Sequence, residues 1–390
     1  MQHKDRLINL VLSRIENLAC TAKELSLLLH RHPEISGQEK LACQTLSDYL
    51  IKQGFSVQTP LASLPTAFKA QAGQGQRIAF IAEYDALPEI GHGCGHNLIA
   101  AASALAASAL LPVCEHAACE ISVIGTPAEE HGSYKIKMIE KGIFNGIDIA
   151  LLAHPSAQYD SATIQTYALA EIEVIFYGKA AHAASTPAEG INALDAIILS
   201  FNAINALRQQ LPENCRVHGI ITHGGDAANI IPEKASATFM VRSRDGRYLH
   251  TLVQRITDIF EGAARQTGAT LNIKMGKVCL NMKNNLALAN AYVDTMKKFH
   301  REVPLYEDRL AFGSTDMGNL SQVLPAIHPV FCISQQECPS HTREFAQLAG
   351  LAESLNEMVL AAKGLALTAL KYLTDEKLRK QVQSEFLESK

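Results

Sequence analysis

Short, continuously apolar segments alternate with helical segments in the first part of the chain, and this alternation restricts the fold more than any other feature. The apolar segments are residues 77–82, 120–125 and 148–153. Residues 98–110 and 134–141 between them have the composition and spacing of helices. Apolar strands separated by helices are typical of a mostly parallel sheet covered by helices on both faces, so we predict an α/β fold.

A different pattern begins near residue 166. Residues 166–177 alternate apolar and polar side chains, as a half-exposed antiparallel strand does. Further helices and strands are predicted at residues 191–210, 216–222, 235–243, 250–267 and 270–278. Helices and an apolar strand at 326–333 follow after residue 283. We therefore predict a discontinuous domain of residues 1–166 and 283–390, interrupted by an inserted α+β domain of residues 167–282.

Composition excludes several classes of protein. The chain has 390 residues and a formal net charge of -4, which does not favour binding to nucleic acid or to anionic membranes. The most apolar stretch, residues 98–113, is about 16 residues long and shorter than the ~20 residues that cross a bilayer. The N-terminal residues lead into an amphipathic helix and do not resemble a secretion signal. We expect a cytoplasmic protein that acts on a small molecule.

Two polar motifs follow the first two predicted strands. Residues 83–97 read EYDALPEIGHGCGHN, in which the alternate residues Cys94 and His96 can point at one metal ion. The alternative is a tight turn before a helix, with a buried cysteine. Residues 126–132 read TPAEEHG, and beside a divalent ion one of the adjacent carboxylates Glu129 and Glu130 can ligate while the other acts as a base. The alternative is a pair of surface charges.

Two further motifs follow the later strands. His154 comes directly after the third strand and is either a ligand or an ordinary turn histidine. His341, in the sequence PSHT, comes after the last predicted strand, and the nearby polar loop GSTDMGN at residues 313–319 is of the kind that lines sites. Ligands of α/β sheets bind at the carboxyl ends of the strands, so these motifs are expected to meet at one edge. Together they provide enough ligands for two metal ions and leave one carboxylate as a general base.

The same motifs resemble those of the metallopeptidase family of aminoacylase and carboxypeptidase G. The match extends over nearly the whole chain, including HRHPEISGQEK at residues 30–40, and is greatest for the subgroup of aminobenzoyl-glutamate hydrolase, hippurate hydrolase and β-alanyl-lysine dipeptidase. The resemblance implies a fold like that of the two-metal exopeptidases. It also implies hydrolysis of an amide bond in a small N-acyl amino acid or dipeptide.

The resemblance also implies roles for individual residues. The metal ligands would be Cys94, His96, Glu130, His154 and His341. Glu129 would be the general base. His182, in the sequence GKAAHA, would reach an active site, often that of a partner subunit, and Asn229 and Arg242 would bind the substrate carboxylate or carbonyl. Two divalent ions per subunit are expected, zinc or manganese before cobalt or nickel, in a homodimer formed through the inserted domain, which would serve as a dimerisation and lid domain.

One residue departs from the pattern of many relatives, which have aspartate where this chain has Asn97. An aspartate there could orient His96 as a hydrogen-bond acceptor. Two other classes of function are weighed against hydrolysis. A zinc deaminase would need a Cys-x-x-Cys motif, which the sequence lacks. A catalytically silent relative that binds metal as a scaffold remains an alternative, although the expected base and ligands are all present.

Overall fold

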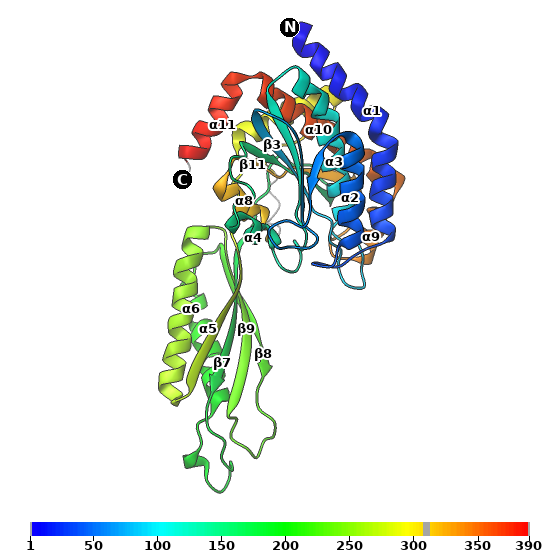
Figure 1. The fold of residues 1–390 in the computed structure, drawn as a ribbon. Helices are drawn as coiled ribbons and strands as arrows, with labels where there is room; N and C mark the ends of the chain where they lie inside the picture. Colours follow the sequence, from blue (N-terminus) through cyan, green and yellow to red (C-terminus); the bar gives the residue numbers. More distant parts are fainter. Residues whose placement is uncertain (1, 307–312, 389–390) are drawn as a thin grey trace. The chain divides into compact units, whose positions relative to one another are not determined.

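The computed structural model describes residues 2–306 and 313–388 and divides into two compact units. Unit 1 consists of Met1–Ile164, Met282–Leu310 and Asn319–Lys390, and unit 2 consists of Gln165–Asn281 and Ala311–Gly318. The mixed α/β fold expected from the sequence is confirmed (Figure 1). Each unit has its own hydrophobic core, so the two are described separately.

A six-stranded sheet in the order β1-β2-β4-β3-β5-β11 forms the centre of unit 1. The four strands β4, β3, β5 and β11 are parallel, while β2 runs antiparallel to both β1 and β4. The strands span Ser56–Gln58 (β1), Phe68–Gly73 (β2), Gln76–Ala82 (β3), Cys119–Gly125 (β4), Ile149–Leu151 (β5) and Ala326–Ile327 (β11). Residues Ile78–Ala82 of β3 are buried on both faces, which explains the continuous apolar run in this strand.

Helices surround this sheet, and the helix after β3 is the most deeply buried. All residues of α3 (His96–Leu110) are buried, and its many alanines let it pack closely against α1 (Gln2–Arg31) and α10 (Ala352–Thr374). The other helices of unit 1 are α2 (Lys40–Gln53), α4 (Tyr134–Glu140), α7 (Leu286–Met296), α8 (Met317–Val323, which begins in unit 2), α9 (Arg343–Leu348) and α11 (Glu376–Glu388). Helix α1 buries Leu7, Val11 and Ile15 at helical spacing, as an amphipathic helix does.

The apolar segment around α3 is longer than the sequence suggested. Together with the following 3₁₀ turn it runs from His96 to Glu115, which is 20 residues and sufficient by length and composition to cross a bilayer. However, 83% of its apolar window is buried inside the protein, as in the core helix of a soluble fold. It is therefore weak evidence for a membrane span.

The predicted strand at residues 326–333 is wrong as a single element. It is divided into β11 and β12 (Val330–Ser334), and β12 pairs in parallel with β6 (His154–Ala157) in a separate two-stranded sheet. The break falls at His328 and Pro329, and proline cannot donate the hydrogen bond that a continuing strand requires. Strands β1 and β2 were also not predicted, because they are short and carry polar residues such as Lys69 and Gln71.

The chain leaves unit 1 at Ile164 and returns to it at Met282. These two points are tied together by the side chain of Asn284, which accepts a hydrogen bond from the backbone N–H of Ile164 at 3.3 Å and donates one to its carbonyl at 2.7 Å. The insertion therefore begins and ends at neighbouring positions on unit 1.

Unit 2 is a four-stranded antiparallel sheet in the order β10-β7-β9-β8, against which two helices pack. Its strands and helices span Ala168–Tyr177 (β7), Ala193–Arg208 (α5), Cys215–His223 (β8), Lys234–Ser243 (β9), Gly246–Thr267 (α6) and Thr270–Cys279 (β10). Helix α6 buries Leu249, Leu252, Ile256 and Phe260 on one face, which gives it its amphipathic pattern. The edge strand β8 exposes Ile220 and Ile221, with 66% and 46% of their surface accessible.

Candidate metal centre

The four motifs of unit 1 come together at the carboxyl ends of β3 and β4 and the start of β6. Ligand-type atoms of Cys94, His96 and His154 lie within 4.8 Å of one another, as do those of Cys94, Glu130 and His341, and those of His96, Glu129 and Glu130. All six residues that the sequence singled out in this unit thus form one cluster. Cys94, His96 and Glu130 each belong to two of these three groups, so the groups overlap.

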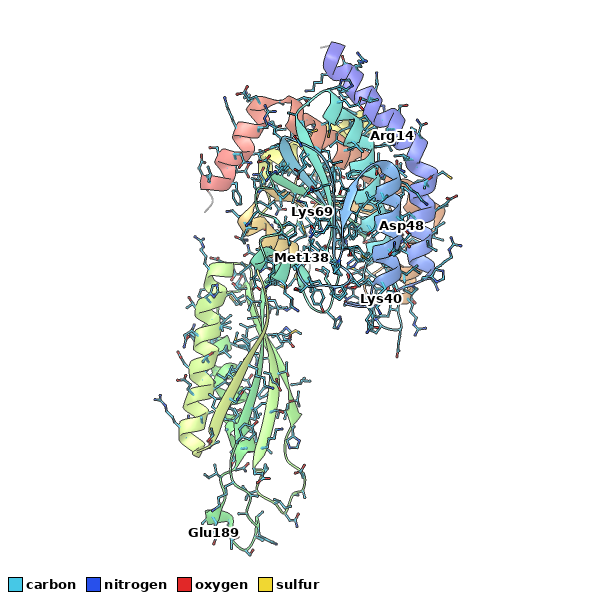
Figure 2. The ribbon with its side chains drawn as sticks, in the orientation of Figure 1. Arg14, Lys40, Asp48, Lys69, Met138 and Glu189 are labelled. Atoms are coloured by element: carbon cyan, nitrogen blue, oxygen red, sulfur yellow. The ribbon has the colours of Figure 1, made fainter. Side chains whose placement is uncertain are left out.

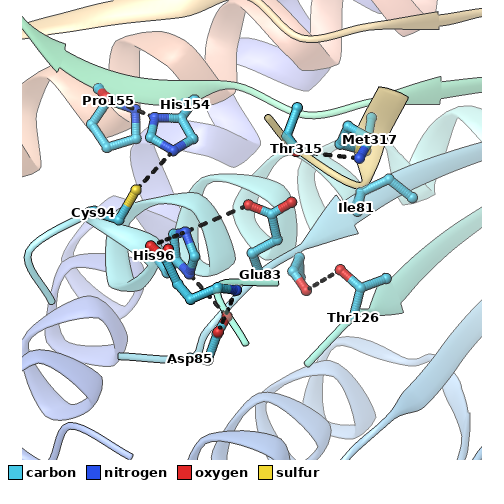
Figure 3. A network of polar contacts seen from close by, with 12 residues as sticks. Ile81, Glu83, Asp85, Cys94, His96, Thr126, His154, Pro155, Thr315 and Met317 are labelled. Carbon is cyan, nitrogen blue, oxygen red and sulfur yellow. Dashed lines mark hydrogen bonds and ion pairs between the residues drawn. The ribbon is translucent and has the colours of Figure 1, made fainter. Parts of the chain in front are cut away.

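His96 is the first residue of α3 and is fully buried. Its Nδ1 lies 3.0 Å from Oδ1 of Asp85, so its Nε2 faces Glu83 and Glu130 (Figure 3). Burial alone would raise the pKa of Asp85, but the charge and hydrogen bond of His96 hold it well below its usual range. Burial alone would lower the pKa of His96, but Asp85 and Cys94 raise it. In the metal-free protein these two residues form a buried ion pair.

Cys94 and His154 face each other at 3.4 Å between Sγ and Nε2 (Figure 3). Their approach depends on Gly95, which has a left-handed φ of 73° and whose missing Cβ would lie 2.5 Å from the ring of Pro155. The Nδ1 of His154 lies 2.8 Å from the carbonyl of Pro155, which leaves Nε2 directed at the cluster. Burial and the positive charge of His96 lower the pKa of His154 to about 4, so its imidazole is neutral at pH 7.

Glu130 and His341 complete the cluster from two other segments. The Nε2 of His341 lies 3.3 Å from Oε1 of Glu130, and the backbone N–H of His341 donates to the carbonyl of Gly93 at 2.8 Å. Burial would raise the pKa of Glu130, but His341 and His96 lower it, so this carboxylate is charged at neutral pH. His341 is half exposed, and its hydrogen bond to Glu130 raises its pKa.

The cluster fits divalent metal ions on three counts. Nε2 of His96 is buried without a hydrogen-bond partner among the described residues, and such an orphaned atom is rare in folded proteins. A thiol and three imidazoles suit zinc and similar divalent ions, and the carboxylates add the oxygen donors that harder ions prefer. His96 and His154 each engage Nδ1 with an oxygen acceptor, which is the arrangement that orients a metal-binding histidine.

Sequence reasoning missed a buried ion pair beside the cluster. Lys135 is fully buried, and its Nζ lies 2.8 Å from Oε1 of Glu83 and 3.2 Å from the hydroxyl of Thr126. Glu83 lies in the same EYDALP motif as Asp85, but no role was predicted for either carboxylate. Their alternate positions after a buried strand, beside a cysteine and a histidine, were the available signal.

The structure corrects the role considered for position 97. Asn97 does not contact His96, because its side-chain amide donates to the hydroxyl of Ser26 and to the carbonyl of Ala349, each at 3.0 Å. Asp85 is the residue that orients His96. Asn97 fastens α3 to α1 and to the segment before α10, and an aspartate could not donate to the Ala349 carbonyl.

Two of the three residues proposed in unit 2 lie in neighbouring loops. The N–H of Ala183 donates to the carbonyl of Asn229 at 3.0 Å, so the segments that carry His182 and Asn229 pair with each other. Both loops extend from the same end of β7 and β9, where Figure 2 marks Glu189. Nδ1 of His182 accepts hydrogen bonds from the N–H groups of Ala184 and Ser185, each at 3.2 Å. The exposed Nε2 is therefore the protonated nitrogen and a hydrogen-bond donor.

Arg242 lies at the opposite end of this sheet. It pairs with Leu169 at the start of β7, whereas Lys234, next to the Asn229 loop, pairs with Tyr177 at its end. Eight residues of strand separate Lys234 from Arg242, or about 26 Å. Arg242 is half-buried, and its guanidinium donates to the hydroxyl of Ser314 at 3.2 Å. His182 and Asn229 are thus near each other, and Arg242 of the same chain is not near either.

Comparison with known proteins places these features in context. Residues 164–268 match the peptidase dimerisation domain of the M20 family. The chain is 38% identical to the Xaa-Arg dipeptidase of Mus musculus over 96% of its own length and 90% of that protein. It is 29% identical to one of the subunits of p-aminobenzoyl-glutamate hydrolase from Escherichia coli, over 91% of the chain and 89% of that protein.

Solved structures show the same fold. An aminobenzoyl-glutamate utilization protein from Klebsiella pneumoniae superimposes with a TM-score of 0.72 at 17% identity, covering 93% of this chain and 98% of that one. A dinuclear metal-binding peptidase of the M20 family from Bacillus subtilis superimposes with a TM-score of 0.67 at 18% identity, covering 91% and 99%.

Proposed function

The chain belongs to the M20 family of metallopeptidases and is an amide-bond hydrolase; from this premise we propose that it is a two-metal dipeptidase. The observation that carries the proposal is the pair of ligand groups that share Cys94, one with His96 and His154 and the other with Glu130 and His341. Glu129 lies beside both groups and remains as a base. A scaffold without activity would not require that residue.

Each residue of the cluster has a defined task in this proposal. Cys94, His96, Glu130, His154 and His341 would hold two divalent ions; when bound, these would lower the pKa of a water molecule and polarise the scissile carbonyl. Zinc and manganese suit this mixture of sulfur, nitrogen and oxygen donors. Asp85 holds the ring of His96 in the correct tautomer. Glu129 takes a proton from the attacking water and then gives it to the leaving amine.

Unit 2 contributes the groups that bind the substrate. The Nε2–H of His182 donates to the oxyanion, and Asn229 binds a substrate oxygen nearby. Arg242 binds the free carboxylate of the substrate, which selects dipeptides over internal peptide bonds. A dipeptide spans only about 7 Å, so His182 and Arg242 of one chain, at opposite ends of a sheet, do not meet on the same substrate molecule.

This separation supports a homodimer in which each substrate meets His182 from one protomer and Arg242 from the other. The exposed edge of β8, with Ile220 and Ile221, offers a surface on which a second copy can pair. The match of this unit to a peptidase dimerisation domain supports the same arrangement.

The substrate class is tested with a hydrolysis panel on metal-reconstituted protein. We propose dipeptides with a C-terminal arginine, because the Xaa-Arg dipeptidase is a relative that matches nearly the whole chain. Aminobenzoyl-glutamate and N-acetyl amino acids form the comparison set. We expect kcat/KM to be highest for Xaa-Arg dipeptides and to fall about 100-fold when the C-terminal carboxylate is amidated, because a bidentate charged contact is lost. Bound metal without turnover of any member would support the silent relative instead.

Sharing of the site between protomers is tested by complementation. His182→Ala is expected to lower kcat about 100-fold, because one oxyanion donor is removed. A dimer that combines a His182→Ala protomer with a Glu129→Gln protomer retains one complete site. Random pairing of equal amounts is then expected to restore about a quarter of the wild-type activity, since half of the dimers are mixed and each has one working site. Each variant alone is the control. If mixing restores nothing, His182 serves its own chain and the dimer proposal is wrong.

A further inference from the structure

The segment Glu34–Lys40, which connects α1 to α2, is part of the motif HRHPEISGQEK. The mechanism proposed above assigns no role to its residues. The sequence of the segment is EISGQEK, and its side chains contact two of the segments that carry the candidate site in unit 1, at Asp85 and at Ala128. Neither Ser36 nor Glu39 lies in the metal-ligand groups. What these two side chains hold in place is therefore a separate question.

Glu39 is a fully buried carboxylate that accepts three hydrogen bonds. Its Oε1 accepts from the N–H groups of Gly37 at 2.7 Å and Ala128 at 2.9 Å, and its Oε2 accepts from the hydroxyl of Thr66 at 2.8 Å. An unpaired charge in this position would be strongly unfavourable, so these donors are what allow the carboxylate to be buried. One of these donors is the N–H of Ala128, the residue that precedes Glu129.

That backbone amide belongs to a strained residue. Ala128 is buried and has a φ of 56°, in the left-handed region that non-glycine residues avoid. Such a conformation persists only where the surroundings hold it. The hydrogen bond that the N–H of Ala128 donates to Glu39 is one contact that stabilises this conformation. The direction in which the side chain of Glu129 leaves the backbone depends on this turn.

Ser36 makes the second contact, on the other side of the two glutamates. Its hydroxyl donates to Oδ2 of Asp85 at 2.7 Å and accepts from the N–H of His131 at 3.2 Å. The same Oδ2 accepts from the N–H of Glu130 at 3.0 Å. The N–H groups of Ala128, Glu130 and His131 are therefore bound by Glu39, by Asp85 and by Ser36, respectively.

We propose that Glu39 and Ser36 are positioning residues that fix the turn Ala128–His131, and so aim Glu129 and Glu130 at the metal centre. The inference rests on the proposed function, in which Glu129 is the base. The N–H groups of Gly37 and Ala128 both donate to Oε1 of Glu39. The positioning role therefore requires a hydrogen-bond acceptor at this oxygen and does not require a negative charge. The amide of a glutamine reproduces that acceptor and can donate to Thr66, whose hydroxyl is able to accept.

The test compares four variants in the metal-loaded protein. Glu39→Ala, assayed at saturating metal, is expected to lower kcat about 100-fold with KM unchanged, since a small misplacement of a catalytic group has effects of this size. Glu39→Gln is expected to stay within about fivefold of wild type, the value of one ordinary hydrogen bond. Should Glu39→Ala fail to fold, Ser36→Ala provides the milder change, with an expected loss of about tenfold in kcat.

Glu34→Ala is the matched control. Glu34 lies in the same loop, and its carboxylate also accepts two backbone N–H groups, those of Leu41 at 3.0 Å and Ala42 at 2.9 Å at the start of α2. We expect this variant to lower the melting temperature but to keep kcat. If Glu39→Ala has no greater effect on kcat than Glu34→Ala, or if Glu39→Gln is as impaired as Glu39→Ala, the proposal is overturned.

A measurement without substrate separates this inference from the proposed function. Hydrogen exchange of the peptide that contains residues 127–131 is expected to be faster in Glu39→Ala than in wild type, and unchanged in Glu34→Ala. Unchanged exchange in Glu39→Ala would overturn the positioning role. Absence of any hydrolysis by the wild-type protein would instead defeat the proposed function and leave the exchange result standing.

Discussion

Replacing Glu129 with glutamine is expected to lower kcat by about 10³-fold while the metal content stays unchanged. Glutamine has nearly the same shape and fills the same space, but it cannot take a proton from water at neutral pH. General acid–base catalysis is worth about 10² to 10⁴-fold, and here one carboxylate both accepts the proton and returns it to the leaving amine. KM is expected to change little, because Glu129 is not assigned to substrate binding.

The measurement is steady-state hydrolysis of an Xaa-Arg dipeptide together with metal analysis of the purified variant. Glu140→Gln is a suitable control, because Glu140 is exposed at the end of the nearby helix α4. A Glu129→Gln protein that keeps more than about a tenth of the wild-type kcat would rule Glu129 out as the base. A variant that has lost its metal would show instead that Glu129 is a ligand.

Removal of the metal ions is the second change with a large expected effect. Dialysis against a chelator should abolish hydrolysis, and addition of zinc or manganese should restore it. The melting temperature should fall as well, because ions present at about 1,000 times their Kd stabilise the folded state by about 4 kcal/mol. Activity that survives with no metal detectable in the protein would contradict the two-metal assignment.

Metal binding should also release protons. In the metal-free protein, burial and the charge of Glu130 raise the pKa of Cys94, while Asp85 raises that of His96. Both residues therefore carry a proton at pH 7 that a metal ion must displace, whereas His154, with its pKa lowered to about 4, does not. These two residues should make metal affinity rise with pH by about two powers of ten per unit, and His341, whose pKa is also raised, adds to the dependence while it carries a proton. Calorimetry in buffers of different ionisation enthalpy counts the protons, and Cys94→Ser should reduce the count by about one.

The sequence was sufficient to predict those strands and helices that have a clear hydrophobic pattern of their own. The segment Ile78–Ala82 is buried on both faces and is apolar throughout, so its place in a parallel sheet could be inferred directly. Strand β2 alternates buried and exposed residues, but it contains Lys69 and Gln71 and was overlooked. Strands β11 and β12 form one apolar run in the sequence, and only pairing with two different strands shows that they are separate.

The candidate site was predictable as a set of residues but not as a network of contacts. Cys94, Glu130 and His341 could be grouped because each follows a strand or a strand-linked loop. The partner of His96 was assigned to the wrong position, because Asn97 is adjacent in sequence while Asp85 is 11 residues away. On a helix, consecutive side chains point about 100° apart, which directs Asn97 toward Ser26 and away from the metal centre. Such contacts depend on packing between segments, which local patterns do not encode.

The two hydrogen bonds between Asn284 and Ile164 have a consequence for how this protein architecture can change in evolution. Because the side chain joins the points where the insertion leaves and re-enters unit 1, the ends of the inserted segment are held together by contacts within unit 1 itself. Insertions whose ends are close together are tolerated without disturbing the host fold. The inserted module can therefore change in evolution while the fold of unit 1 and its candidate metal centre are retained.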